Sequence, residues 1–163
     1  MDKPAKKCDA ARRPGDTDLA SLGLDAFDYG FLCAARYFFV AFSGNPNAWI
    51  HAILNADAFF PHTQSADCMR AALAAVQDMR ASRRSCFHFS NPSCPCCSVI
   101  VTPDERHLVQ LFQHVRQGHT SRAASSAMLL CEGRDTSALI TSMHALSAFA
   151  PGAKQSARTV LHS

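Results

Sequence analysis

The sequence lacks an apolar run long enough to cross a membrane. The most apolar stretch, Tyr29 to Phe42, has 14 residues, fewer than the roughly 20 that a spanning helix needs, and it contains Arg36 near its middle. The first 18 residues also lack an apolar stretch behind Lys3, Lys6 and Lys7, so they do not read as a secretory signal. We therefore expect no membrane span and a cytoplasmic protein with reduced thiols.

The sequence also lacks an excess of one charge and any signature of catalysis. Its 16 Lys and Arg and 13 Asp and Glu leave a net charge of +3, so a nucleic acid is not expected as a partner. Neither a GxGxxG nor a GxxxxGK[ST] phosphate loop is present, and HExxH, GxSxG and paired carboxylate motifs are missing as well. These absences favour a protein that is not an enzyme.

What the sequence does contain is alanine-rich helical periodicity. Apolar residues recur at three- and four-residue steps, which predicts an all-α fold, a compact array of five or six helices joined by one Cys-rich loop. We expect a single helical domain over 18–150, between a flexible tail at 1–17 and a frayed C-terminus at 151–163. The predicted helices run from Asp18 or Ser21 to Phe42, over 48–58, from Ser65 or Asp67 to Ala81, from Pro103 to a stop at Gly118, over 121–132 and over 136–149.

Side-chain patterns predict which helix faces are buried. Phe31 and Phe38 belong to one apolar stripe of the first helix, and Trp49, Ile53 and Leu54 lie on the second. In the helix over 121–132 the inward residues are expected to be Ala124, Met128 and either Leu129 or Leu130. Thr102-Pro103-Asp104-Glu105 has the form of a capping box with proline at the first helical position.

The Cys-rich segment, residues 86–97, reads CFHFSNPSCPCC and is the chemically unusual part of the chain. Residues 85–90 alternate polar and aromatic side chains, which predicts an extended strand. Thiolates and imidazole are preferred ligands of zinc, and four thiolates suit an iron–sulfur cluster. The candidate metal ligands are Cys86, His88, Cys94, Cys96 and Cys97.

Two other interpretations of the Cys-rich segment stay open. Cys94 and Cys97 have the CxxC spacing of a thiol-based redox sensor, and the segment can also be a connecting loop whose thiols are incidental. The sequence as a whole is typical of a non-enzymatic, intracellular regulator or adaptor, of bacterial type, whose partner is another protein. The alternative function is a metal-binding or thiol-based redox sensor centred on residues 86–97.

Overall fold

The computed structural model describes residues 12–152, and these residues are mostly helical. The helix-forming segments become six helices of at least eleven residues and one single turn. The helices are α1 (Ala26–Phe42), α2 (Ala48–Phe59), α3 (Ser65–Ser82), α4 (Pro95–Ser98), α5 (Pro103–Arg116), α6 (Thr120–Leu130) and α7 (Ser137–Ser147). The expected all-α array is therefore confirmed, and the single turn α4 lies in the Cys-rich segment.

A very small antiparallel sheet joins the beginning of the described chain to the end of the Cys-rich region. Strand β1 (Thr17–Asp18) pairs with β2 (Ile100–Val101), with Thr17 opposite Val101. The tail predicted at 1–17 thus has its last residue in a strand, while residues 1–11 lie outside the described residues. At the other end the description reaches Gly152, so most of the predicted frayed C-terminus also lies outside it.

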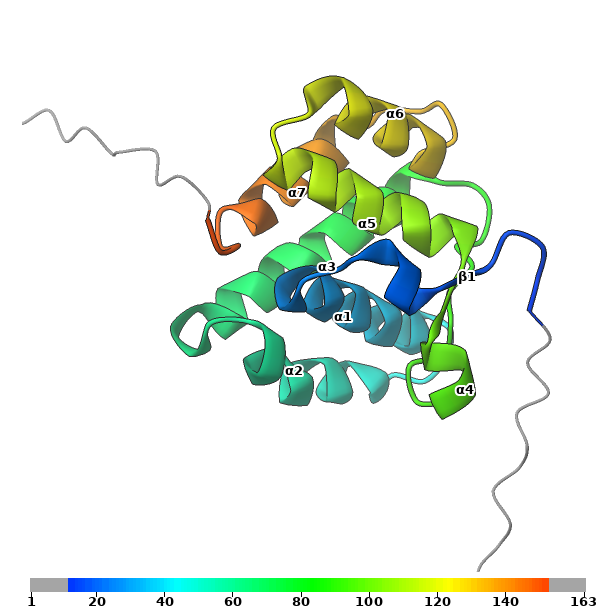
Figure 1. Cartoon of the computed structure of the whole chain (residues 1–163), viewed down its shortest axis with the longest axis vertical. Coiled ribbons are helices and arrows are strands. Elements are labelled where there is room, and N and C mark those ends of the chain that lie inside the picture. The colour runs from blue at the N-terminus through cyan, green and yellow to red at the C-terminus, as the bar shows by residue number, and fades with distance from the viewer. Residues whose placement is uncertain (1–11, 153–163) are drawn as a thin grey trace, which may run out of the picture.

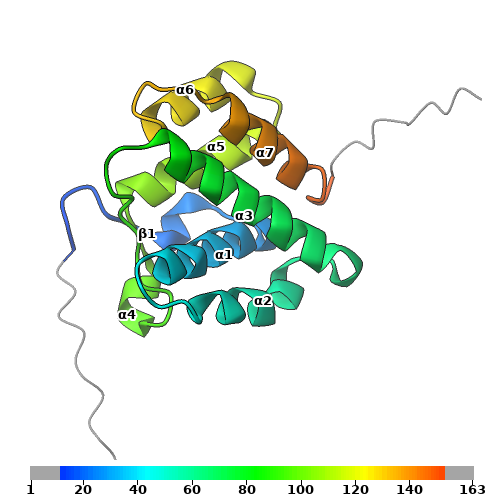
Figure 2. The ribbon, with the colours of Figure 1, turned by 180° about the vertical axis from the view of Figure 1, so that it is seen from behind.

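Helix α1 lies inside the array, and α2 lies at one edge of it (Figures 1 and 2). The main helix pairs are α1 with α2, α5 with α6, and α3 with α7, and α1 also contacts α3 and α5. Within residues 12–152, this arrangement leaves one long side of α2 without a neighbouring helix, at the lower edge of both views.

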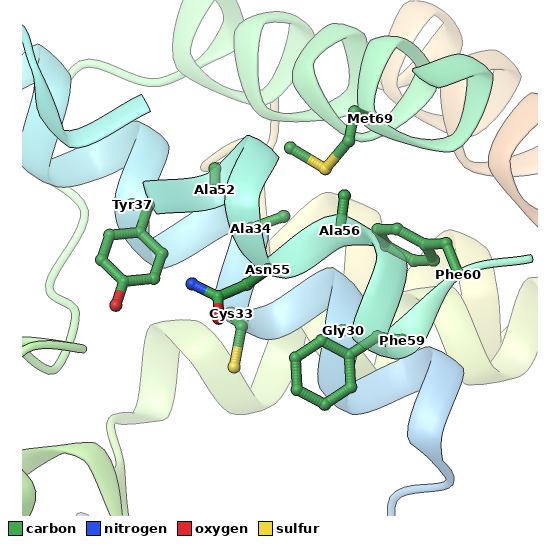
Figure 3. A pocket seen from close by; sticks show the side chains of 10 residues that line it. All are labelled: Gly30, Cys33, Ala34, Tyr37, Ala52, Asn55, Ala56, Phe59, Phe60 and Met69. Atoms are coloured by element: carbon green, nitrogen blue, oxygen red, sulfur yellow. The ribbon is translucent and has the colours of Figure 1, made fainter. Parts of the chain in front are cut away.

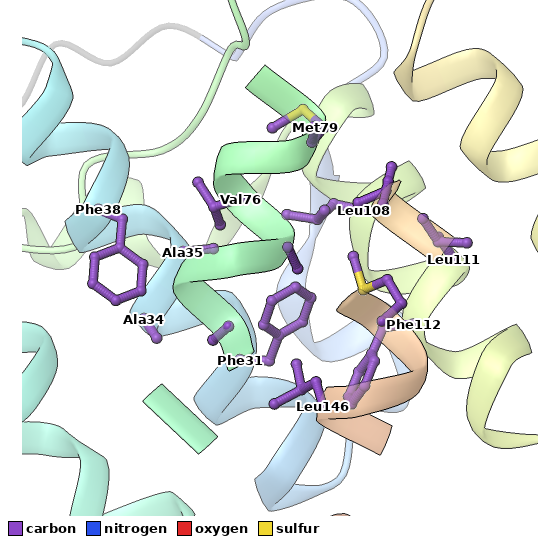
Figure 4. Close-up of a cluster of buried hydrophobic side chains, with 14 of the residues drawn as sticks. Phe31, Ala34, Ala35, Phe38, Val76, Met79, Leu108, Leu111, Phe112 and Leu146 are labelled. Carbon is purple, nitrogen blue, oxygen red and sulfur yellow. The ribbon is translucent and has the colours of Figure 1, made fainter. Parts of the chain in front are cut away.

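The core forms where α1, α3, α5 and α7 meet (Figure 4). Phe31 of α1 lies against Phe112 of α5, with their ring centroids 5.0 Å apart. Met79 of α3 and Leu146 of α7 are fully buried in the same cluster, and Phe38, expected in the interior, is buried as well. A smaller cluster of Leu32, Val101 and Val109 fixes the sheet end of the molecule. Among the described residues, no helix combines the length and apolarity that crossing a membrane requires.

The predicted start of the first helix was wrong. Residues Leu19–Leu22 form a separate 3-10 turn, which ends where Gly23 adopts a left-handed conformation with φ of 59°. The helix begins after Asp25, whose side chain accepts a hydrogen bond of 2.8 Å from the backbone N–H of Asp28. The turn at Gly23 and the cap at Asp25 therefore determine where the helix begins, and the apolar residues before them do not extend it.

The strand predicted over 85–90 was also wrong, because the backbone N–H groups of this stretch bond to carboxylates instead of a neighbouring strand. Ser85 donates to Glu132, His88 donates to Asp104 at 2.8 Å, and Ser90 donates to Glu105 at 3.0 Å. The alternating aromatic residues of the stretch still have a role, since the rings of Phe87 and Phe89 both stack on Phe39.

The inward face predicted for the helix over 121–132 needs correction too. Leu130 is buried as expected, but Ala124, Met128 and Leu129 are exposed. The buried positions are instead occupied by small residues, Ala123, Ser126 and Ala127, on a helix that packs mainly against α5. The larger apolar side chains of this helix therefore do not mark its buried face.

Candidate functional site

The Cys-rich segment is attached to the helical core by a buried ion pair, Arg36 of α1 with Glu105 of α5. The Arg36 Nε donates to Glu105 Oε1 at 2.7 Å, and Nη2 donates to Oε2 at 3.1 Å, with both side chains about fully buried. Arg36 also donates to the carbonyls of Ser98 at 2.7 Å and Ile100 at 2.6 Å. The guanidinium therefore fixes the chain immediately after the Cys-rich segment.

Glu105 extends this anchor to the segment itself. Its carboxylate accepts hydrogen bonds from the backbone N–H groups of Ser90 and Thr102, at 3.0 and 2.9 Å. Thr102 in turn accepts from the Glu105 N–H at 3.2 Å, so the predicted capping box is confirmed. The Thr102 hydroxyl also donates to the carbonyl of His88 at 2.7 Å. One carboxylate thus caps a helix, pairs with a buried cation and holds the segment.

Two further carboxylates hold the first half of the segment and the two residues before it. Asp104 accepts from the His88 backbone N–H, lies 3.4 Å from His88 Nδ1 and pairs with Arg83 at 3.4 Å. Glu132 accepts from the N–H of Arg84 and from the hydroxyl and N–H of Ser85. The hydrogen bonds from Ser85 and Arg84 lower the pKa of Glu132 from its ordinary 4.5 to about 2.

The structure does not gather the five predicted metal ligands around one point. Cys86, Cys96 and His88 are exposed, and the His88 ring faces Asp104, whereas Cys94 and Cys97 are half-buried at the single turn α4. Among residues 12–152, no three His, Cys, Asp or Glu side chains lie where they could hold a metal ion together. Zinc or iron–sulfur binding by these residues therefore stays a prediction.

Three cysteines outside the segment behave as buried or partly buried small hydrophobic groups. Burial raises the pKa of the Cys68 thiol to about 11 and also raises the pKa values of Cys33 and Cys131. A hydrogen bond with Cys33, together with burial, raises the pKa of Tyr29 to about 12. Because the thiolate is the reactive form, these raised values make the three thiols poor nucleophiles.

The concave features beside these residues are small. A pocket of about 120 Å³ between α1, α2 and the chain near Pro92 is lined by Tyr29, Cys33 and Asn55, and one of about 200 Å³ lies beside His88 and Asp104. A third, of about 10 Å³, lies between α1 and α2 and has room for about one water molecule (Figure 3). Sites for small organic ligands commonly have volumes of about 300–1,000 Å³.

The outer face of α2, formed by Trp49, Ile50, Ile53 and Leu54, is the feature that sequence reasoning missed. The exposed fractions of these residues are 49%, 41%, 50% and 72%, although all four are large and apolar. The opposite side of α2 buries Ala48, Ala52 and Ala56 against α1. The signal was present in the sequence, since these alanines recur every four residues and form a second stripe.

No protein-family model matches the chain, and no curated protein or solved structure matches it either.

Proposed function

We propose that this chain is a non-enzymatic, cytoplasmic regulator or adaptor that acts through protein–protein contact, and that the outer face of α2 is its contact surface. The observation that carries the proposal is the distribution of side chains on α2. Three of its four alanines lie inside and its tryptophan, isoleucines and leucine lie outside, the reverse of what a helix at the edge of a monomer needs. A bacterial source stays a prediction.

The apolar character of this face favours its burial against a partner. Single exposed leucines are ordinary on protein surfaces, but a contiguous apolar patch usually marks an interaction site. Tryptophan is also enriched among the residues that contribute most to binding at interfaces. The other exposed large apolar residues of the described chain are spread over four parts of the fold: Phe42 ends α1, Leu73 lies on α3, Val99 follows α4, and Met128 and Leu129 are neighbours on α6.

A photo-reactive amino acid at position 53 tests this proposal in living cells. Irradiation should produce a discrete adduct with a protein that mass spectrometry identifies, because Ile53 lies in the middle of the face. The matched control carries the same group at Leu129, which is exposed to a similar degree on α6. Absence of any adduct from position 53, or the same adducts from both positions, would refute α2 as the contact surface.

A second candidate function, a thiol-based sensor, is favoured by the local structure of Cys94 and Cys97. Cys94 is the N-cap of α4 and Cys97 is its third residue, so one helical turn places them on the same side. The backbone N–H of Ser98 donates to the Cys94 carbonyl at 2.8 Å, which closes this turn. Loss of two electrons and two protons to a disulfide or peroxide oxidant would join the two sulfurs.

Metal content and oxidant response separate the alternatives for the Cys-rich segment. Protein purified without oxygen should contain zinc or iron if the segment is a metal site, and Cys94→Ser and Cys97→Ser should each lose it. A sensor should contain no metal and should form a reversible disulfide between these two residues. Cys33→Ser on α1 is the control, which should change neither property. A segment that shows neither behaviour is a connecting loop.

A further inference from the structure

We infer that the outer face of α2 pairs with the same face of a second copy of this chain, antiparallel and across a twofold axis. The inference rests on the proposed function, because it names the partner of the same surface. It is carried by three observations: the arrangement of the four apolar residues, the charges around them, and the area that they expose.

The four residues form two parallel ridges at four-residue spacing, Trp49 with Ile53 and Ile50 with Leu54. The two ridges are related by an approximate twofold axis midway between residues 51 and 52. In an antiparallel pair about this point, Trp49 lies opposite Ile53 of the other copy, and Ile50 lies opposite Leu54. In a twofold interface, a residue i that contacts residue j of the other copy is matched by a residue j that contacts residue i of the other copy. Both pairs satisfy this condition.

The charges around the face are compatible with a second copy of the chain and do not favour binding to a lipid surface. Between Ala48 and Ala56 the sequence contains no Lys, Arg, Asp or Glu, and the one acidic residue of α2 is the exposed Asp57, one turn beyond Ile53 at the C-terminal end of the face. In an antiparallel pair the two Asp57 carboxylates lie at opposite ends of the contact, so two copies meet without like-charge repulsion. His51 stacks on Tyr37 of α1, with ring centroids 5.6 Å apart, at the side of α2 that faces α1. Helices that bind a lipid surface usually carry Lys or Arg beside their apolar face, and α2 carries none. An antiparallel pair also opposes the two helix dipoles.

The exposed area predicts a weak dimer. With the exposed fractions given above, one copy offers on the order of 400 Å² of apolar surface, and two copies would bury on the order of 800 Å² before their rims are added. Specific interfaces smaller than about 1,200 Å² are typically weak or transient. We therefore expect a dissociation constant on the order of 10–100 µM.

Opposite charges placed at residues that the pairing brings together test the inference. In sedimentation velocity experiments over a concentration series, the native chain should change from monomer to dimer. Ile50→Glu and Leu54→Lys should each weaken the dimer at least tenfold. Both residues are exposed, so the variants should keep the helical circular dichroism of the native chain. Leu129→Lys, the matched change on α6, should leave the association unchanged.

Mixing the two charged variants tests the antiparallel register. An equimolar mixture should associate more strongly than either variant alone, because Glu at position 50 of one copy meets Lys at position 54 of the other. No gain on mixing would refute this register, and a native chain that stays monomeric up to millimolar concentration would refute the dimer. If that monomer still forms an adduct with a different protein from position 53, the proposed function stands. If it forms none, both fail.

Discussion

At the scale of single residues, Gly30 determines how closely α1 and α2 can approach. A Cβ atom added at Gly30 would lie 2.4 Å from the Cβ of Phe59, far closer than van der Waals contact allows. Phe59 is the last residue of α2, and its Cβ is fixed to the backbone, so rotation of the ring cannot relieve the clash. Figure 3 shows the Phe59 ring beside Gly30 at the end of the pocket between the two helices.

We expect Gly30→Ala to destabilise the protein. Alanine gains about 1 kcal/mol of helix propensity over glycine, but overpacking in a core typically costs about 1–3 kcal/mol. Urea denaturation should therefore show a net loss of free energy of unfolding. The control Ser125→Ala, at an exposed position of α6, should be neutral or slightly stabilising. A more stable Gly30→Ala variant would show that α2 can move away from α1 at no cost.

The Arg36–Glu105 pair gives a second prediction at this scale. Removing one partner of a buried pair leaves the other charge without compensation, which typically costs about 3–5 kcal/mol. Arg36→Met and Glu105→Met should each lower the free energy of unfolding by about this amount. The double variant should lose less than the two single losses together, because neither charge is then left unpaired. Additive losses in chemical denaturation would contradict the close pairing.

Only part of this residue-level structure could be predicted from the sequence. The capping box could be predicted because Thr102 and Glu105 are three residues apart and follow a local rule. The ion pair joins residues 69 apart, and no local pattern indicates that Arg36 and Glu105 meet. The clash that requires glycine at position 30 depends on where α2 lies, so it could not be predicted either.

At the scale of elements, Glu132 links the end of α6 to the two residues that precede the Cys-rich segment. Its carboxylate accepts hydrogen bonds from Arg84 and Ser85. The backbone of Glu132 is left-handed, with φ of 55°, in the turn after α6. Glutamine can keep the shape of the side chain but not the charge. The contribution of the charge to stability should therefore depend on pH in a way that Glu132→Gln removes.

The direction in which stability changes with pH follows from the lowered pKa of Glu132. A carboxyl whose pKa falls from 4.5 in the unfolded chain to about 2 in the folded chain binds fewer protons when folded. The stability from the ionised carboxylate is complete above about pH 5 and is lost as the pH falls through 4.5 toward 2. Urea denaturation at several pH values should show native and Glu132→Gln proteins differing above pH 5 and converging near pH 2. A constant difference over this range would contradict the assignment.

Helix positions could be predicted better than helix faces. The bounds of α2 and α5 came within about two residues, because Pro46, Pro103 and Gly118 mark helix ends in the sequence. The faces of α2 and α6 could not be predicted from side-chain size, since both helices bury small residues against their neighbours. Close packing favours alanine at such contacts, and a pattern search that counts large apolar residues misses it.

At the scale of the whole molecule, the all-α class followed from the periodicity of the sequence, but the arrangement of the helices did not. Nothing in the sequence indicates that α3 packs on α7 or that α2 lies at the edge with one side uncovered. The candidate metal site depends on the same arrangement: among the described residues no three of its five predicted ligands lie where they could hold a metal ion together, and metal binding stays a prediction. The carboxylates of α5 and of the turn after α6 determine the path of the Cys-rich segment.

The fluorescence of Trp49 tests most directly whether the outer face of α2 contacts a second copy of the chain. Trp49 is the only tryptophan in the chain, and it is half exposed on that face, so its emission reports on this surface alone. From about 1 µM to about 500 µM protein, a range that spans the expected dissociation constant, the emission should shift to shorter wavelength and acrylamide quenching should fall. Ile50→Glu should abolish both changes. Unchanged emission and quenching over the whole range would contradict the pairing of two copies through this face.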